Sequence, residues 1–164
     1  MTNSVMLILA LAMIHCESSG RDSKLGDFPP WYEQTHVFEV DVKYARARGC
    51  LQIHESYVED VNRILGFSRF SWDDAFERDD SVEMMYIYTS FYAAYWRLGR
   101  TPTLEDIARI HKDGPNGYRD ADSLTYWRRV EARLLMIAAA YTWEPASTDD
   151  PALLAQGNKD RRTN

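Results

Sequence analysis

Three separated stretches of the sequence hold side chains that could do chemistry together: residues 15–20 (HCESSG), 49–53 (GCLQI) and 109–118 (RIHKDGPNGY). Glu17 follows an apolar run, Val5 to Ile14. A carboxyl group at the end of an apolar helix is poorly solvated when ionised, so it can keep a proton available near neutral pH. Glu17 is therefore the candidate general acid, a role typically worth roughly two to four powers of ten in rate.

In this order the three stretches resemble motifs of the lysozyme superfamily. The first resembles the glutamate-serine-x-glycine motif of lytic transglycosylases and of goose-type and invertebrate-type lysozymes, and the second their glycine-x-x-glutamine-isoleucine strand. The third, followed by Tyr126 and Trp127, resembles the invertebrate-type (destabilase) motif arginine-isoleucine-histidine-asparagine-glycine-glycine-proline-asparagine-glycine. The resemblance covers about Met6 to Val130. It implies an enzyme that cleaves the β-1,4 glycan of peptidoglycan or a related amino-sugar polysaccharide, with Glu17 facing the glycosidic oxygen.

The same resemblance implies several substrate contacts. Gln52 would hydrogen-bond at the cleft wall, and Asn116 and Tyr118 belong to the turn that touches substrate. His111 could contact substrate or act as a base, whereas a lone histidine beside a turn is often structural. Tyr92 lies in an aromatic-rich stretch and is expected either to line the sugar cleft or to pack in the core.

A hydrolase also needs a second carboxylate, about 5 Å from the acid if it retains configuration and about 6.5–9.5 Å away if it inverts. Asp41, followed by valine and eight residues before Gly49, resembles the aspartate of the invertebrate type. Asp27 is the rival, with the following segment as an insertion, and Asp22 is a third choice. Without any of them, Glu17 would act alone as acid and then base, which is transglycosylase chemistry.

Three departures from the family pattern favour an alternative, a catalytically weak or inactive glycan-binding or structural module. Lys112 and Asp113 replace the asparagine-glycine of the third motif, the loop between the first two motifs is long, and two cysteines replace several disulfides. Cys16 and Cys50 could form one bridge if the protein is exported. A helical interaction domain unrelated to sugars is a third hypothesis.

Composition limits the class of protein. Hydrophobic residues make up 45% and charged residues 27%, which is typical of a globular chain. Nineteen basic against twenty-five acidic residues give a net charge of −6, which argues against nucleic-acid binding. The four histidines and two cysteines have no recognised metal-ligand spacing, so neither a metal nor another cofactor is expected.

The pattern of breakers and caps predicts a mainly helical fold of the α+β lysozyme-like type, with about six helices and a small β-like element after the first helix. The expected domain covers 1–143 and is followed by a loose tail, 144–164. Helices are expected over 4–18, 55–65, 72–78 and 122–142, and a strand over 37–42. A capping box at 80–83 is expected to open a helix that runs to Leu98, and Thr103 to cap a helix that runs to Lys112. Residues 114–117 are expected to form a turn.

The apolar run near the N-terminus has two interpretations. Val5 to Ile14 is similar to the apolar part of a signal peptide, but no Lys or Arg precedes it. The run is too short to span a bilayer. The motif argument favours a buried first helix, because removal of this run would also remove the helix that carries Glu17. Action on cell wall would imply an extracytoplasmic location.

Overall fold

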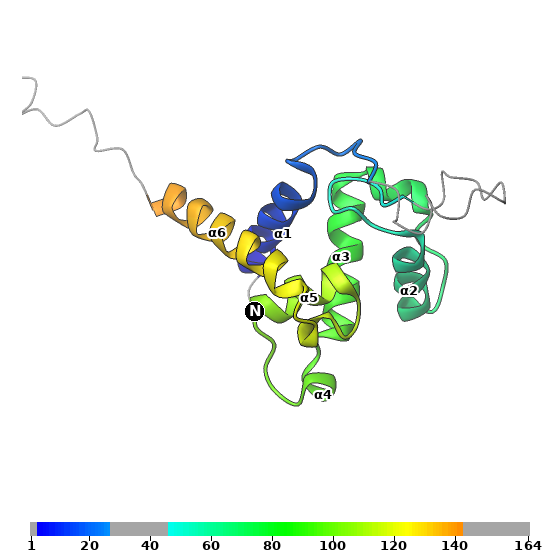
Figure 1. Ribbon diagram of the computed structural model, residues 1–164. Coiled ribbons are helices and arrows are strands. Elements are labelled where there is room, and N and C mark those ends of the chain that lie inside the picture. Colours follow the sequence, from blue (N-terminus) through cyan, green and yellow to red (C-terminus); the bar gives the residue numbers. More distant parts are fainter. Residues whose placement is uncertain (1–2, 27–45, 143–164) are drawn as a thin grey trace, which may run out of the picture.

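The structure is a computed structural model that describes residues 3–26 and 46–142 (Figure 1). This part of the chain is mainly helical, as the sequence predicted. Its elements are α1 (Asn3–Ser18), α2 (Glu55–Leu65), the 3₁₀-helix η2 (Trp72–Phe76), α3 (Arg78–Tyr92), α4 (Tyr95–Leu98), α5 (Leu104–Asp113), the 3₁₀-helix η3 (Gly117–Arg119) and α6 (Ser123–Thr142). The predicted strand 37–42 and the tail from 144 lie outside the described residues.

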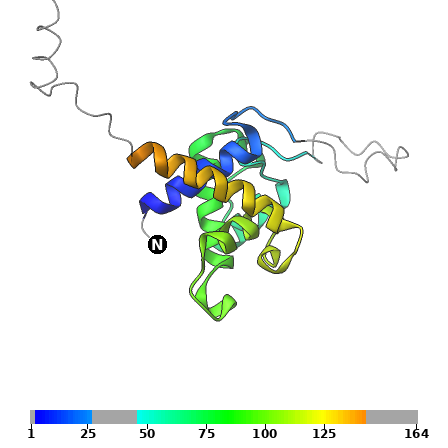
Figure 2. The same ribbon diagram turned by 60° about the vertical axis from the view of Figure 1, so that its left-hand side comes forward.

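Helix α1 is buried along most of its length. It packs against α6 and α5, and both views show α6 running across it (Figures 1 and 2). Its core side chains include Leu9, Met13 and Ile14, whereas Leu7 is exposed. A run of apolar residues without Gly or Pro explains this helix, which ends where Gly20 adopts a positive φ of 84°. Within the described ranges, no helix has the length and apolar character needed to cross a membrane.

Two further helices have the ends that their local sequence predicts. Gly66 stops α2 in the left-handed conformation, with φ 81°. Thr103 caps α5, because its hydroxyl accepts a hydrogen bond from the Asp106 backbone N–H while the Asp106 carboxylate accepts one from the Thr103 backbone N–H. The capping box fixes where α5 begins, and therefore where His111 and Lys112 lie near its end.

The prediction of a single helix from the capping box at Ser81 to Leu98 is wrong. Helix α3 begins earlier, at Arg78, and Ser81 lies inside it. The buried Ser81 hydroxyl donates to the Ala75 carbonyl at 2.6 Å, so a tertiary contact uses the group that would have capped a helix. The helix also ends at Tyr92, and Tyr95 begins the short α4, where its side chain is 67% exposed.

The small β-like element consists of two isolated antiparallel bridges, Leu25 with Arg48 and Arg48 with Ile53. Residues 49–52 form a turn rather than the strand that the family motif implies. Gly49 has φ 74°, and a Cβ atom there would overlap the Ala75 carbonyl oxygen, so only glycine fits without a backbone shift. This turn, called the glutamine turn below, presents Gln52 to the cavity described next.

Candidate active site

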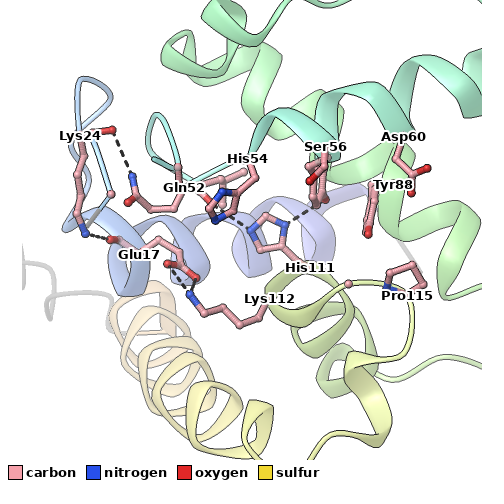
Figure 3. Close-up of a pocket in the computed structure, with 15 residues that line it drawn as sticks. Glu17, Lys24, Gln52, His54, Ser56, Asp60, Tyr88, His111, Lys112 and Pro115 are labelled. Atoms are coloured by element: carbon pink, nitrogen blue, oxygen red, sulfur yellow. Dashed lines mark hydrogen bonds and ion pairs between the residues drawn. The ribbon is translucent and has the colours of Figure 1, made fainter. Parts of the chain in front are cut away.

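A cavity of about 680 Å³ lies between the end of α1, the glutamine turn, α2 and the end of α5 (Figure 3). Glu17, Gln52 and His111 all line it. Each comes from a different one of the three stretches singled out in the sequence, so the fold brings these stretches to one place. Two further lining side chains, Tyr57 and Tyr88, provide aromatic rings stacked at 3.8 Å between centroids.

Glu17 occupies the last turn of α1, and its side chain is only 8% exposed. The Lys112 ammonium lies 3.2 and 3.3 Å from its two carboxylate oxygens. A second ammonium, that of Lys24, donates to the backbone carbonyl of Glu17. Beside them, burial and the charge of Glu17 raise the pKa of Tyr126 well above its ordinary value. The carboxyl group is therefore enclosed, and its closest charged neighbour is a lysine.

Gln52 is held in the glutamine turn at φ 53°, an unusual conformation for a residue with a side chain. Its amide nitrogen donates to the backbone carbonyls of Gly49 at 2.8 Å and of Lys24 at 3.3 Å. These bonds tie the segment after α1 to the turn and fix the amide at the cavity wall. Gln52 and Glu17 consequently lie at the same end of the cavity (Figure 3).

His111 joins three parts of the site through its ring. It is buried, its Nε2–H donates to the Leu51 carbonyl at 3.2 Å, and the Tyr57 hydroxyl donates to Nδ1 at 3.1 Å. Burial lowers the pKa of His111 to about 4, so the ring is neutral at neutral pH. Because both nitrogens are engaged, the geometry fits a ring that holds α5 against α2 and the glutamine turn.

The other predicted substrate contacts do not line the cavity. Tyr92 is buried behind Tyr88, with ring centroids 4.6 Å apart, and its hydroxyl donates to the Asp60 carboxylate. Asn116 is exposed, and its side-chain oxygen accepts from Arg97 at 3.2 Å. Tyr118 is half-buried and is not among the residues that line the cavity. From the turn 114–117, it is instead Gly114 and Pro115 that reach the cavity.

The described residues that line the cavity near Glu17 include no second carboxylate. Asp27 and Asp41 lie outside the described residues. Asp22 pairs with Arg78 at 2.8 Å and lines a different hollow. Asp60 is the other acidic residue among the described lining, and Figure 3 shows it at the opposite end of the cavity from Glu17.

Sequence reasoning missed several residues of the lining, among them His54, Lys24 and Tyr57. His54 directly follows the glutamine motif and lies at the Glu17 end (Figure 3). Burial, and then the charge of Lys112, lower the pKa of His54, so its imidazole is neutral at neutral pH. Tyr57 follows one helical turn later on α2. The proximity of His54 and Tyr57 to Gln52 along the chain was the available signal for these two residues.

The described residues contain no group of three or more His, Cys, Asp or Glu side chains arranged to hold a metal ion. Cys16 and Cys50 are free thiols, one half-buried and one buried. No protein-family model matches the sequence, and no curated protein matches it.

Proposed function

We propose that this protein cleaves the β-1,4 glycan of peptidoglycan, with Glu17 as the general acid. The observation that carries the proposal is the convergence of Glu17, Gln52 and His111 on one cavity. Motifs can follow one another in a given order along the chain without lying at the same site. The lysozyme-like resemblance requires residues of all three motifs to line one cavity.

The surroundings of Glu17 suit this role. A buried carboxyl group that takes up a proton can deliver it to a glycosidic oxygen bound in the cavity. The half-buried ring of Tyr57, backed by the buried ring of Tyr88, lines the cavity farther along, and aromatic rings are good partners for the apolar faces of sugars. The cavity volume, about 680 Å³, is within the usual range for small-ligand sites.

A hydrolytic route needs a second carboxylate beside Glu17. Asp41, which the motif resemblance favours, and its rival Asp27 both lie outside the described residues. If neither aspartate contributes, Glu17 serves as both acid and base, as in a transglycosylase.

The test compares digestion of purified peptidoglycan by the unmodified protein and by Glu17→Gln. We expect the rate to fall by at least about a hundredfold, because the amide cannot donate the required proton. Glu131→Gln, at an exposed glutamate of α6, is the matched control and should retain full activity. Equal rates for the Glu17 variant and the unmodified protein would remove Glu17 from the chemistry.

The products and two further variants separate the routes. Mass spectrometry distinguishes reducing ends, left by a hydrolase, from anhydro ends, left by a transglycosylase. For a hydrolase, we expect one of the variants Asp41→Asn and Asp27→Asn to lose activity and the other to keep it. The variant that loses activity identifies the second catalytic group.

One observation favours a second candidate, a non-catalytic glycan-binding module. The Lys112 ammonium lies 3.2 and 3.3 Å from the two carboxylate oxygens of Glu17, so the group that would meet the glycosidic oxygen is already engaged by a protein side chain. This candidate predicts glycan binding without any cleavage between pH 4 and 8. Measurable turnover that depends on Glu17 would exclude it.

A further inference from the structure

Among the described residues that line the Glu17 end of the cavity, positive side chains outnumber negative ones. Lys24 and Lys112 both line it, whereas Glu17 is the only lining carboxylate there. Asp113 does not line the cavity but lies close enough to interact electrostatically with Lys112 and Glu17. The whole chain has a net charge of −6, so this excess is local. At the other end, Asp60 is balanced by Arg63, with a nitrogen 2.6 Å from its carboxylate.

The two lysines differ in what holds them. Lys24 donates to a backbone carbonyl, which does not change with the protonation state of Glu17. Lys112 contacts the carboxylate itself, and its side chain is 38% exposed, so it is accessible from the cavity. The Lys112 nitrogen also lies 5.3 Å from the centroid of the Tyr126 ring, which keeps it at this end.

General acid chemistry disturbs this pair. When Glu17 takes up a proton from solvent, it no longer balances the Lys112 ammonium. A partly buried ammonium without a counter-charge is unfavourable, so a negatively charged group bound beside Lys112 would stabilise the protonated site. A neutral sugar cannot supply this charge, but a sugar that carries a carboxylate can.

We propose that Lys112 binds a carboxylate carried by the sugar beside the scissile bond, so that substrate binding takes the ammonium away from Glu17. This inference rests on the proposed function and names the form of the substrate. In a peptidoglycan strand, the sugar-borne acid is the lactyl group of muramic acid, and it is charged only where no peptide is joined to it through an amide bond. The preferred substrate is therefore a peptide-free strand, and the reaction that supplies it is an amide hydrolysis.

Lys112 is also one of the two positions, with Asp113, at which this chain departs from the third invertebrate-type motif, which has asparagine at the Lys112 position. An amide can hydrogen-bond a neutral sugar, whereas an ammonium group gains most from an anionic one. The inferred specificity thus explains the departure as a change in substrate rather than a loss of activity.

The decisive measurement is calorimetric binding by the Glu17→Gln variant, which cannot ion-pair with Lys112. The two ligands are a tetrasaccharide of alternating N-acetylglucosamine and N-acetylmuramic acid with free lactyl carboxylates, and the same compound with these groups converted to methyl amides. We expect the acid form to bind about five- to tenfold more tightly, which is typical of one partly exposed ion pair. Equal affinity for the two ligands would overturn the inference.

Second-site variants in the Glu17→Gln background identify the residue responsible. Lys112→Gln should abolish the preference for the acid ligand, and Lys112→Arg should retain it. Arg129→Gln is the matched control, because it removes the same charge from a residue that does not line the cavity but also lies near Tyr126, 5.7 Å from the ring centroid. Loss of the preference in the control, or its survival in Lys112→Gln, would assign the effect to general charge instead.

These results separate this inference from the proposed function. Selective binding of the acid ligand without cleavage by the unmodified protein would support the role of Lys112 and contradict the catalytic role of Glu17. Cleavage of both ligands with equal kcat/KM would support catalysis and overturn the role of Lys112.

Discussion

The two ends of the cavity are built in different ways. The Glu17 end collects charged and polar groups from α1, the glutamine turn and α5, which are distant in sequence. The tyrosine end is made by α2 and α3, where Tyr57 stacks on Tyr88 and Asp60 pairs with Arg63. The Asp60 carboxylate at the tyrosine end is paired with Arg63, whereas at the Glu17 end the Lys112 ammonium is paired with a group that would change its charge in the proposed reaction.

This difference indicates a division of roles. The tyrosine end offers fixed apolar faces that suit a neutral sugar ring, and the Glu17 end offers the groups that can move a proton. His111 joins the two, since its ring accepts from Tyr57 on one side and donates to Leu51 on the other. The variants below test whether each end depends on the contacts that we assign to it.

Gly49→Ala should have the largest effect, because it affects the anchor of the Glu17 end. The added Cβ would overlap the Ala75 carbonyl, and a positive φ is itself unfavourable for alanine. We expect the free energy of unfolding to fall by about 4 kcal/mol in urea titrations. Gly66→Ala is the matched control, since Gly66 also has a positive φ but no atom within 4 Å of the added carbon. It should cost about 1 kcal/mol. Similar losses in both variants would show that the glutamine turn is not anchored on Ala75.

The buried ring of His111, which joins the two ends of the cavity, should make stability depend on pH. The folded protein holds the pKa of His111 near 4, below its ordinary value of 6.5, so the unfolded chain binds more protons between these values. Stability is therefore complete above pH 6.5 and falls as the pH drops toward 4, by roughly 3 kcal/mol. His111→Gln should reduce this dependence. Unfolding titrations at pH 7, 5.5 and 4.5 provide the measurement, and identical pH dependence in the two proteins would count against a buried neutral ring.

Tyr92→Phe should have the smallest effect and should be confined to the tyrosine end. The variant loses the hydrogen bonds of the hydroxyl with Asp60 and Arg63, so we expect a loss of about 1 kcal/mol in stability. The KM for glycan should not change, because Tyr92 lies behind the lining. Tyr95→Phe, at an exposed position on α4, should change neither quantity. A raised KM for Tyr92→Phe alone would show that this tyrosine contacts substrate after all.

Local signals predicted several elements well. The apolar run predicted α1, Gly66 predicted the end of α2, and the box of Thr103 and Asp106 predicted the start of α5. The same kind of signal failed at Ser81, where the buried hydroxyl binds Ala75 instead of capping a helix. A capping box is a pattern of spacing, and spacing alone does not report which groups become buried.

For the site, the residue types and their order in the sequence drew attention to Glu17, Gln52 and His111, all of which line the cavity. The sequence alone also showed that Lys112 and Asp113 depart from the third motif. It did not separate Gly114 and Pro115, which reach the cavity, from Asn116, which faces solvent in the same turn. A turn of four residues points its side chains in different directions, and packing against neighbouring helices decides which of them are covered.

The sequence by itself determined where most helices form, because helix formation depends on residues within a few positions of one another. Only the tertiary structure decided that the Lys112 ammonium meets the Glu17 carboxylate and that His111 links the two ends of the cavity. These contacts join residues far apart along the chain. Their distances depend on how α1, α2 and α5 pack together, and no local pattern encodes that packing.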